Sequence, residues 1–209
     1  MILEGIVTTI SPEGTLNIAP MGPIVDERMQ RIVLRPFNTA DTYRNLKALG
    51  EGVLHVTDDV LLLAKAALGP IEPLPEVERA TAILGYVLRD ACRWYEFIVR
   101  KIDDREERVT IEAEVVHSGR GRDFFGFNRA KHAVLEAAIL ATRTAFLPLD
   151  DIAAEFRKLA VIVKKTGGPQ EHAAFALLEQ HLEKCIGAAC GLAKSGAVPS
   201  AKPQAANNP

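Results

Sequence analysis

The spacing of apolar residues changes along this chain, and that change constrains the fold most. The N-terminal part consists of β-branched runs separated by turn clusters, as where Ser11 to Gly14 separates Ile2 to Ile10 from Thr15 to Ala19. After Asn128, apolar residues recur at the three- and four-residue spacing of helices. Strands followed by helices predict an α+β protein with a β-barrel half and a helical half.

Two short helices are expected among the strands of the N-terminal half. A third strand should end at Arg35 and Pro36, because proline cannot continue the ladder. The first helix should begin with Thr39 or Asp41 as its cap and end at Gly50, where a left-handed residue is favoured. The remaining elements expected here are a strand over 52–57, a helix over 60–68 capped by Asp58 or Asp59, and a hairpin of strands 94–102 and 108–117.

Three helices are predicted in the C-terminal half. The first is capped by Asn128 and should end at Pro148, and the next two span 149–165 and 170–194. A tail rich in proline, alanine and asparagine follows and is expected to be disordered. The organisation is therefore a barrel domain over 1–126, a helical segment packed on it over 127–194, and a disordered tail over 195–209.

Composition excludes several classes of protein. A net charge of -2 and a pI near 6.2 argue against nucleic-acid binding, which depends on clustered basic residues. No stretch approaches the roughly 20 apolar residues of a membrane span, and the N-terminus lacks the features of a signal peptide, so a cytoplasmic protein without a membrane partner is expected. Three cysteines do not predict a disulfide framework, and no metal-ligand spacing is present.

The segment Arg35-Pro-Phe-Asn-Thr-Ala-Asp-Thr-Tyr-Arg-Asn45 concentrates groups that bind phosphate. It contains guanidinium groups, threonine hydroxyls, an asparagine amide and an expected helix N-terminus, whose free backbone N–H groups and dipole favour an anion. The same residues also suit an ordinary capped helix with solvated arginines, which is a common arrangement. Taken alone, the segment leaves both interpretations open.

A second segment, Thr15-Leu-Asn-Ile-Ala-Pro-Met-Gly-Pro23, places a small residue and prolines where a strand ends. A flat ring could lie against the backbone that Ala19 leaves bare and accept hydrogen bonds from it. The alternative is a plain strand exit that exposes the amide of Asn17.

The loop Gly119-Arg-Gly-Arg-Asp-Phe-Phe-Gly126 is basic and aromatic. Its glycine spacing does not match the dinucleotide-binding pattern, and no βαβ unit surrounds it. It could cover a ring or receive an anionic substrate through Arg120, Arg122 and Arg129, whereas an ordinary connecting loop fits equally well.

The remaining chemically interesting side chains favour structural roles. His55 lies in an expected strand, where a histidine is more often a hydrogen-bonded core residue than a proton donor. Trp94 and Tyr95 begin a strand and are expected in the core or at a dimer interface. No nucleophile motif is present, so the sequence assigns no catalytic residue.

Together these segments resemble an uncharacterised, domain-of-unknown-function group of split-barrel flavoproteins, related to flavin reductases and more distantly to pyridoxamine phosphate oxidases. The resemblance covers roughly residues 2–145. It rests on Glu4-Gly-Ile-Val-Thr-Thr9, Leu16-Asn-Ile-Ala-Pro-Met-Gly-Pro23, Arg35-Pro-Phe, Thr42-Tyr-Arg-Asn-Leu46, Val56-Thr-Asp-Asp59 and Gly126-Phe-Asn-Arg-Ala-Lys131.

This resemblance implies an FMN-binding split barrel that forms a homodimer with flavin near the subunit interface. It implies that Thr39, Thr42 and Asn45 hold the FMN phosphate with Arg35 as a partner, and that the strand with Asn17 lines the isoalloxazine ring. The full cofactor-binding set is Thr8, Asn17, Ala19, Pro20, Met21, Arg35, Phe37, Thr39, Thr42, Asn45 and Thr57, and the substrate-contacting set is Arg122, Phe125 and Arg129.

The function expected from the resemblance is that of an FMN-dependent oxidoreductase acting with a small-molecule electron donor or acceptor. Because a flavin carries the hydride and electron chemistry itself, the protein needs no acid or base of its own. Two alternatives remain open: a flavin-binding or flavin-carrying dimeric module without turnover, and a protein that takes a deazaflavin in place of FMN.

Overall fold

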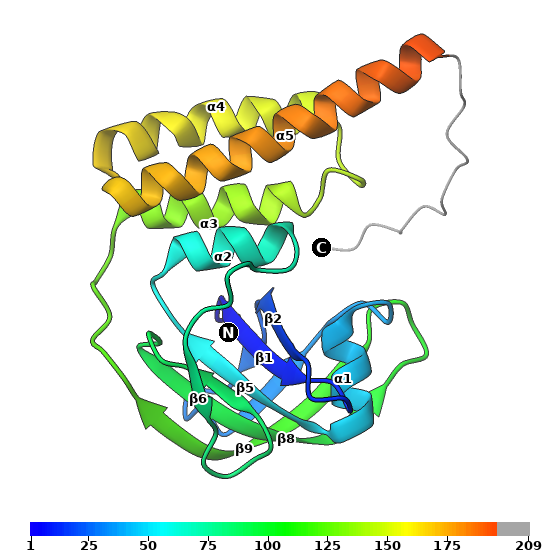
Figure 1. The fold of residues 1–209 in the computed structure, drawn as a ribbon, viewed down its shortest axis with the longest axis vertical. Coiled ribbons are helices and arrows are strands. Elements are labelled where there is room, and N and C mark those ends of the chain that lie inside the picture. Colours follow the sequence, from blue (N-terminus) through cyan, green and yellow to red (C-terminus); the bar gives the residue numbers. More distant parts are fainter. Residues whose placement is uncertain (196–209) are drawn as a thin grey trace.

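The computed structural model describes the backbone of residues 1–195 and the side chains of residues 1–189. Apart from Ser195, the tail predicted to be disordered over 195–209 lies outside the described residues. Seven strands form one curled antiparallel sheet in the order β2-β1-β5-β8-β9-β4-β3, which leaves β2 and β3 as its edges (Figure 1). Their bounds are β1 Gly5–Ile10, β2 Leu16–Met21, β3 Ile24–Val25, β4 Arg31–Leu34, β5 Glu51–Val56, β8 Arg93–Asp103 and β9 Thr110–Arg120.

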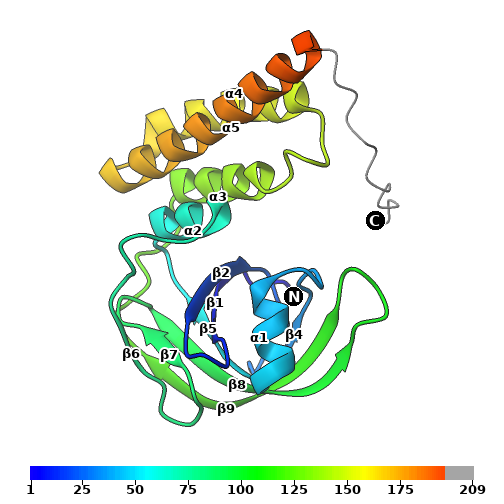
Figure 2. The ribbon, with the colours of Figure 1, turned by 45° about the vertical axis from the view of Figure 1, so that its right-hand side comes forward.

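Helix α1, Asp41–Leu49, lies across the mouth of the curled sheet (Figure 2). It ends as predicted at Gly50, which has a positive φ of 72° and caps the helix with its backbone N–H. Tyr43 and Leu46 of α1 are buried in the core inside the sheet. A short hairpin of β6, Val77–Arg79, and β7, Tyr86–Leu88, was not expected from the sequence.

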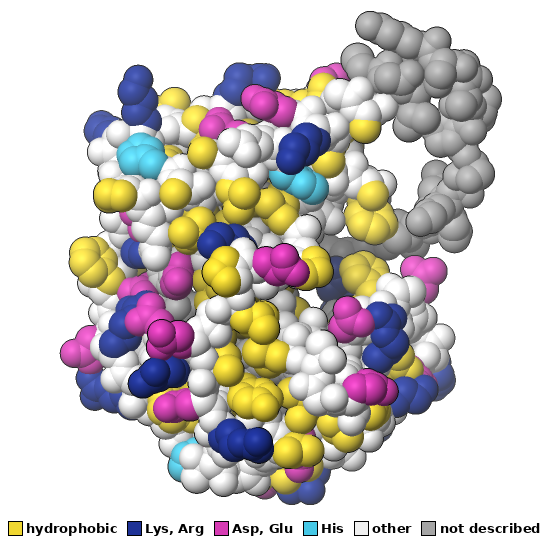
Figure 3. Space-filling view, in the orientation of Figure 1, with side chains coloured by type: hydrophobic (Ala, Val, Ile, Leu, Met, Phe, Trp, Pro, Cys, Tyr) yellow, Lys and Arg dark blue, Asp and Glu magenta, His cyan; other side chains and the backbone are white. Residues whose placement is uncertain are grey.

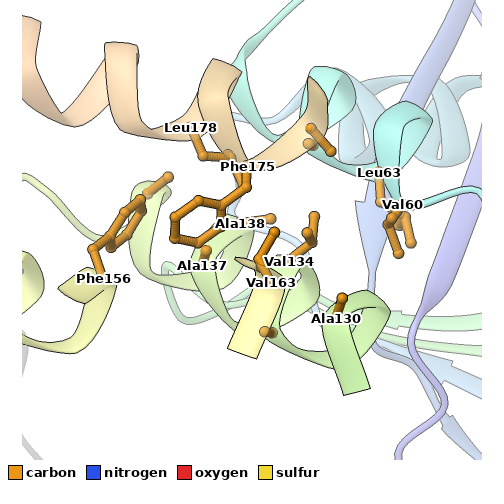
Figure 4. Close-up of a cluster of buried hydrophobic side chains, with 14 of the residues drawn as sticks. Val60, Leu63, Ala130, Val134, Ala137, Ala138, Phe156, Val163, Phe175 and Leu178 are labelled. Atoms are coloured by element: carbon orange, nitrogen blue, oxygen red, sulfur yellow. The ribbon is translucent and has the colours of Figure 1, made fainter. Parts of the chain in front are cut away.

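The other four helices pack together in a layer beside the sheet (Figure 1). Their bounds are α2 Val60–Leu68, α3 Arg129–Ala141, α4 Leu149–Thr166 and α5 Pro169–Ser195. Figure 4 shows Phe156 of α4 close to Phe175 of α5, whose ring centroids are 5.6 Å apart. Helix α2 comes from the middle of the chain yet packs against α3 and α5, so the helical layer is larger than the predicted segment over 127–194.

The molecule has two hydrophobic cores, and β1 contributes to both. Successive side chains of a strand point to opposite faces of the sheet. Accordingly Ile6 is buried in the core shared with the helical layer, and Val7 is buried in the core inside the curled sheet. All six residues of β1 are buried, which explains why this strand reads as an unbroken apolar and β-branched run.

The predicted α+β fold, a split barrel followed by helices, is confirmed, and local signals located most elements. Asn128 caps α3 and Asp59 caps α2 through side-chain acceptance of backbone N–H groups. The end of α3 was wrongly predicted. The helix stops at Ala141, seven residues before Pro148, and Pro148 is instead the N-cap of α4.

His55 is a fully buried core residue, in agreement with the expected structural role. Its Nε2 accepts a hydrogen bond from the backbone N–H of Leu88 at 3.0 Å, so Nδ1 carries the proton and donates to the carbonyl of Ile6 at 3.2 Å. Burial lowers the pKa of His55 to about 4, although the bond to Ile6 acts in the opposite sense. The neutral ring therefore joins β1, β5 and β7.

Candidate functional site

The predicted ring-lining strand is β2, which lies at an edge of the sheet and pairs with β1 only. Its six residues are all partly buried, so Asn17, Ala19, Pro20 and Met21 lie together along one accessible edge. An edge strand presents backbone polar groups that no neighbouring strand occupies. This is the kind of surface against which a flat polar ring can lie.

A cluster of four polar side chains connects α1 to β1 and β2. The amide of Asn17 donates to Thr9 Oγ1 at 3.2 Å and to Thr42 Oγ1 at 3.1 Å, and the amide of Asn45 donates to Thr9 Oγ1 at 3.0 Å. Thr9, Thr42 and Asn45 are buried. The structure thus brings three of the predicted residues together, and adds Thr9, which the sequence reasoning did not assign.

The N-terminus of α1 differs from the prediction that Thr39 or Asp41 caps it. Ala40 occupies the cap position, and no side chain accepts a bond from the first turn. The first backbone N–H groups of a helix have no partner within the helix, so an uncapped start can bind an anion. Arg44 turns back to donate to the carbonyl of Thr39 at 2.6 Å and pairs with Asp41. Thr39 itself is exposed.

Three arginines lie close together, and one of them, Arg108, contacts the loop that precedes α1. Arg108 donates to the carbonyl of Arg35 at 3.4 Å, and its guanidinium carbon lies 4.5 Å from the centre of the Phe37 ring. The pKa of Arg108 is lowered, first by burial and then by the positive charges of Arg35 and Arg143. Phe37 in turn stacks on Phe146, with ring centroids 6.5 Å apart and planes 10° apart.

This group of Arg35, Arg108, Arg143, Phe37 and Phe146 will be called the arginine cluster. It joins the loop before α1, the segment just before β9 and the turn after α3, which are far apart in the sequence. Sequence reasoning identified Arg35 and Phe37 but missed the other three. Arg108 and Arg143 belong to no recognisable motif, so no sequence signal would have found them.

The remaining predicted cofactor residues lie away from the arginine cluster or are already bonded. Thr8 is buried and its hydroxyl donates to the carbonyl of Tyr86 at 2.7 Å. Thr57 is buried and its hydroxyl accepts from the backbone N–H of Asp59 at 3.0 Å. Thr57 also lines a cavity of about 500 Å³ between α2, the proline-rich loop after it and β7. On the face shown in Figure 3, hydrophobic side chains continue from the helical layer onto the sheet half.

The predicted substrate residues belong to the loop between β9 and α3. Arg122 binds Asp58 at 2.5 Å and Asp90 at 3.0 Å, so its charge is already paired. The backbone N–H of Phe125 donates to Asp58 at 2.7 Å, while the Phe125 ring itself is 77% exposed. Arg129 is exposed at the start of α3. The structure therefore groups Arg122 and Phe125 around Asp58.

Asp58 belongs to a larger set of paired groups, which we call the Asp58 network. Burial raises the pKa of this carboxyl, but the Arg122 guanidinium and the Phe125 N–H outweigh burial, so the pKa is lowered. Lys131 of α3 donates to the carbonyl of Asp58 at 2.8 Å and pairs with Glu171 of α5 at 3.0 Å. The network thus connects the turn before α2 to α3, to α5 and to the loop between β9 and α3.

The described residues contain neither a candidate membrane-spanning helix nor a candidate metal site. None of their helices combines the length and the apolar composition that a membrane crossing requires. Likewise, no three His, Cys, Asp or Glu side chains of residues 1–189 are grouped so that they could hold a metal ion.

A solved structure shares this fold, and others resemble it less closely. An FMN-bound protein of Methanosarcina mazei, assigned to the same family as this chain, is 23% identical and superposes with a TM-score of 0.76 over 86% of this chain and 94% of its own. Nitrilotriacetate monooxygenase component B of Bacillus cereus is 21% identical, with a TM-score of 0.47 over 56% of this chain and 69% of its own. The flavin reductase of styrene monooxygenase from Pseudomonas putida S12 is 14% identical, with a TM-score of 0.48 over 56% of this chain and 77% of its own.

Family models cover most of the chain. The model described as the N-terminal domain of a protein of unknown function, DUF447, matches residues 3–122, and a second DUF447 model matches residues 128–180. No curated protein matches the chain. The resemblance drawn from the sequence is confirmed, and the chain belongs to the DUF447 family.

Proposed function

We propose that this protein binds FMN at the junction of β2, the start of α1 and the arginine cluster, and that it is an oxidoreductase of the flavin reductase-like split-barrel type. The isoalloxazine ring lies along β2, against Asn17, Ala19, Pro20 and Met21. The phosphate lies at the uncapped start of α1, near Thr39 and Arg35. The observation that carries the proposal is this meeting of an edge strand, an uncapped helix N-terminus and guanidinium groups that form no ion pair among the described residues.

The donor set fits FMN. A phosphate monoester requires several N–H and O–H donors and a compensating positive charge, and exposed Thr39, exposed Arg35 and the first turn of α1 offer all of these. The buried bonds of Thr42 and Asn45 to Asn17 and Thr9 hold α1 against β1 and β2. The FMN bound in the Methanosarcina mazei protein of the same family supports the same cofactor here.

These positions assign different roles to the cofactor and to the residues of the chain. Bound FMN supplies hydride and electron transfer. The residues of the chain bind the phosphate, orient the ring along β2 and exclude water from it. Our candidates for contacts with the substrate remain Arg122, Phe125 and Arg129. Because Asp58 and Asp90 hold the guanidinium of Arg122, this residue would act by positioning the loop between β9 and α3.

The direct test is to purify the protein and titrate it with FMN. We expect a yellow protein that releases FMN on denaturation and that quenches the fluorescence of added FMN when stripped of cofactor. Mass spectrometry of the released compound distinguishes FMN from a deazaflavin. A colourless protein that leaves FMN fluorescence unchanged would contradict the proposal.

Turnover is tested separately. Anaerobic mixing with NADH or NADPH should bleach the bound flavin if the protein is an oxidoreductase. Stable yellow colour with both donors would favour the non-catalytic, flavin-carrying alternative.

Single substitutions test the placement of the phosphate. Thr39→Val and Arg35→Met should each weaken FMN binding by about 1 to 3 kcal/mol, because each removes one partner of a charged group. Thr15→Val, at an exposed threonine of the β1–β2 turn, is the matched control and should leave the affinity unchanged. Equal affinities in all three variants would mean that the phosphate lies elsewhere.

The proposal includes the homodimer that the resemblance implies, with flavin near the interface. Phe125 and Phe127 support it, because they are 77% and 96% exposed on one loop and form an apolar surface that a second subunit could cover. Light scattering should give the mass of two chains, and replacing both phenylalanines with serine should shift the protein toward the monomer. A monomer in the unmodified protein would contradict this part of the proposal.

A further inference from the structure

The arginine cluster contains more positive charge than the sequence assigned to the phosphate site. Arg108 precedes β9 and Arg143 lies in the turn after α3, yet Arg35 and Arg143 both lie close enough to Arg108 for their positive charges to act on it. The stacked rings of Phe37 and Phe146 fix how the two sides meet, and Arg108 lies over the Phe37 ring.

None of these three guanidinium groups forms an ion pair within the part of the chain that the structure describes. Other arginines nearby in the sequence do find carboxylates: Arg105 pairs with Asp103, and Arg100 pairs with Glu114 at 2.9 Å. The carboxyl of Glu4 lies close enough to Arg143 to be influenced by its charge, but farther away than an ion pair requires. Like charges held together without an ion-paired partner raise the energy of the free protein, and a bound anion lowers that cost.

The position of the cluster identifies the anion. Arg108 contacts Arg35 and Phe37, and Phe37 lies two residues before Thr39, so the cluster adjoins the loop that leads into the uncapped start of α1 to which the phosphate is assigned. A phosphate monoester carries nearly two negative charges at neutral pH and three strong acceptor oxygens. The fork of donors on a guanidinium matches such a group in both charge and geometry.

We propose that Arg108 and Arg143 bind the FMN phosphate together with Arg35, so that the turn after α3 completes the cofactor site and makes it selective for a flavin with a terminal phosphate. This inference rests on the proposed FMN function. It gives the helical half a direct role in cofactor recognition. It also predicts discrimination against riboflavin, which has the same ring but lacks the phosphate.

The experiment compares FMN with riboflavin in cofactor-free protein, using flavin fluorescence. Arg108→Met and Arg143→Met should each weaken FMN binding at least tenfold and leave riboflavin binding within twofold of the unmodified protein. Each variant should also show a weaker dependence of FMN affinity on salt, because one phosphate-directed charge is gone. Arg157→Met, at an exposed arginine of α4 with no described ion pair, is the matched control and should change nothing.

The outcomes separate the two proposals. If the unmodified protein binds FMN and both variants keep its affinity within twofold, the role of Arg108 and Arg143 is overturned while the FMN function stands. If riboflavin binding falls as much as FMN binding, the arginines shape the ring site instead, and the inference is equally overturned. If the unmodified protein binds neither flavin, the proposed function fails as well.

The variant Arg143→Lys tests whether Arg143→Met weakens FMN binding through lost charge or through a change in structure. This variant keeps the charge and should retain part of the FMN affinity that Arg143→Met loses. Circular dichroism of the cofactor-free variants should match that of the unmodified protein. Loss of FMN affinity equal to that of Arg143→Met, with an unchanged spectrum and unchanged salt dependence, would contradict a charge-based role.

Discussion

Two charged regions of this molecule differ in how their charges are compensated. In the Asp58 network every central charge has a partner: Asp58 has Arg122, and Lys131 has Glu171. In the arginine cluster Arg35, Arg108 and Arg143 lie together with no ion pair among the described residues. Both regions join the sheet half to the helical half, so position alone does not distinguish a structural role from a ligand-binding role.

On this difference we base a structural role for the Asp58 network and our proposal that the arginine cluster binds a ligand. Buried charges that are removed from water must be paired, and breaking one pair leaves the other charge uncompensated. Exposed like charges held close together weaken the fold slightly, and they are compensated only when an anion binds. Stability measurements on substitutions in each region therefore test this distinction directly.

The largest effect is expected from Lys131→Met. It leaves the carboxylate of Glu171, which is 8% exposed, without its counter-charge and removes the donor to the carbonyl of Asp58. The free energy of unfolding should fall by about 3 kcal/mol in urea denaturation. Lys158→Met, in the exposed pair with Glu155, is the control and should cost less than about 0.5 kcal/mol. Equal losses in the two variants would remove the distinction between buried and exposed pairs.

Acid should weaken the fold through His55, a buried polar group that is satisfied while neutral. Its pKa is about 4 when folded and about 6.5 in its ordinary state, so its contribution is complete above pH 6.5 and is lost as the pH falls toward 4. Between pH 8 and pH 5 the free energy of unfolding should fall by about 2 kcal/mol. Carboxylates with lowered pKa values, such as Asp58 and Glu171, titrate below this window.

The variant His55→Asn isolates this contribution. Its stability should be lower at pH 8, because Leu88 N–H and the Ile6 carbonyl lose a well-placed partner. Its change between pH 8 and pH 5 should be much smaller than in the unmodified protein. An unchanged pH dependence would assign the acid effect to other groups.

A matched pair of arginine substitutions compares the two regions most closely. Arg122→Met should cost about 1 to 2 kcal/mol, because buried Asp58 loses its guanidinium partner. Arg143→Met should leave the stability of the cofactor-free protein within about 0.5 kcal/mol, because Arg143 forms no ion pair among the described residues and lies close to the positive charge of Arg108. A loss above about 1 kcal/mol for Arg143→Met would show that the cluster is part of the structural framework.

The smallest effect expected is stabilisation of the cofactor-free protein by inorganic phosphate. Millimolar phosphate should raise the free energy of unfolding by less than about 1 kcal/mol, because a weakly bound ligand stabilises only the folded state. Chloride at equal ionic strength is the control, and a double variant Arg108→Met, Arg143→Met should lose the difference between the two salts. An identical response to phosphate and chloride in the unmodified protein would contradict anion binding at the cluster.

The sequence by itself determined the local elements and the class of fold. Asp59 and Asn128 marked the starts of α2 and α3, and Gly50 marked the end of α1, because a cap acts within one turn of its own helix. The run of β1 and the family motifs located the barrel for the same reason, since strand period and turn chemistry are properties of neighbouring residues.

Only the tertiary structure decided which of these elements meet. The sequence did not reveal that α2 packs with α3 and α5, that Thr9 joins Asn17 and Asn45, or that the turn after α3 brings Arg143 to Arg108. Residues more than a hundred positions apart become neighbours through the packing of two cores around β1, which no local pattern encodes. The sequence thus identified the segment that we propose faces the phosphate, and the fold determined which arginines lie near it.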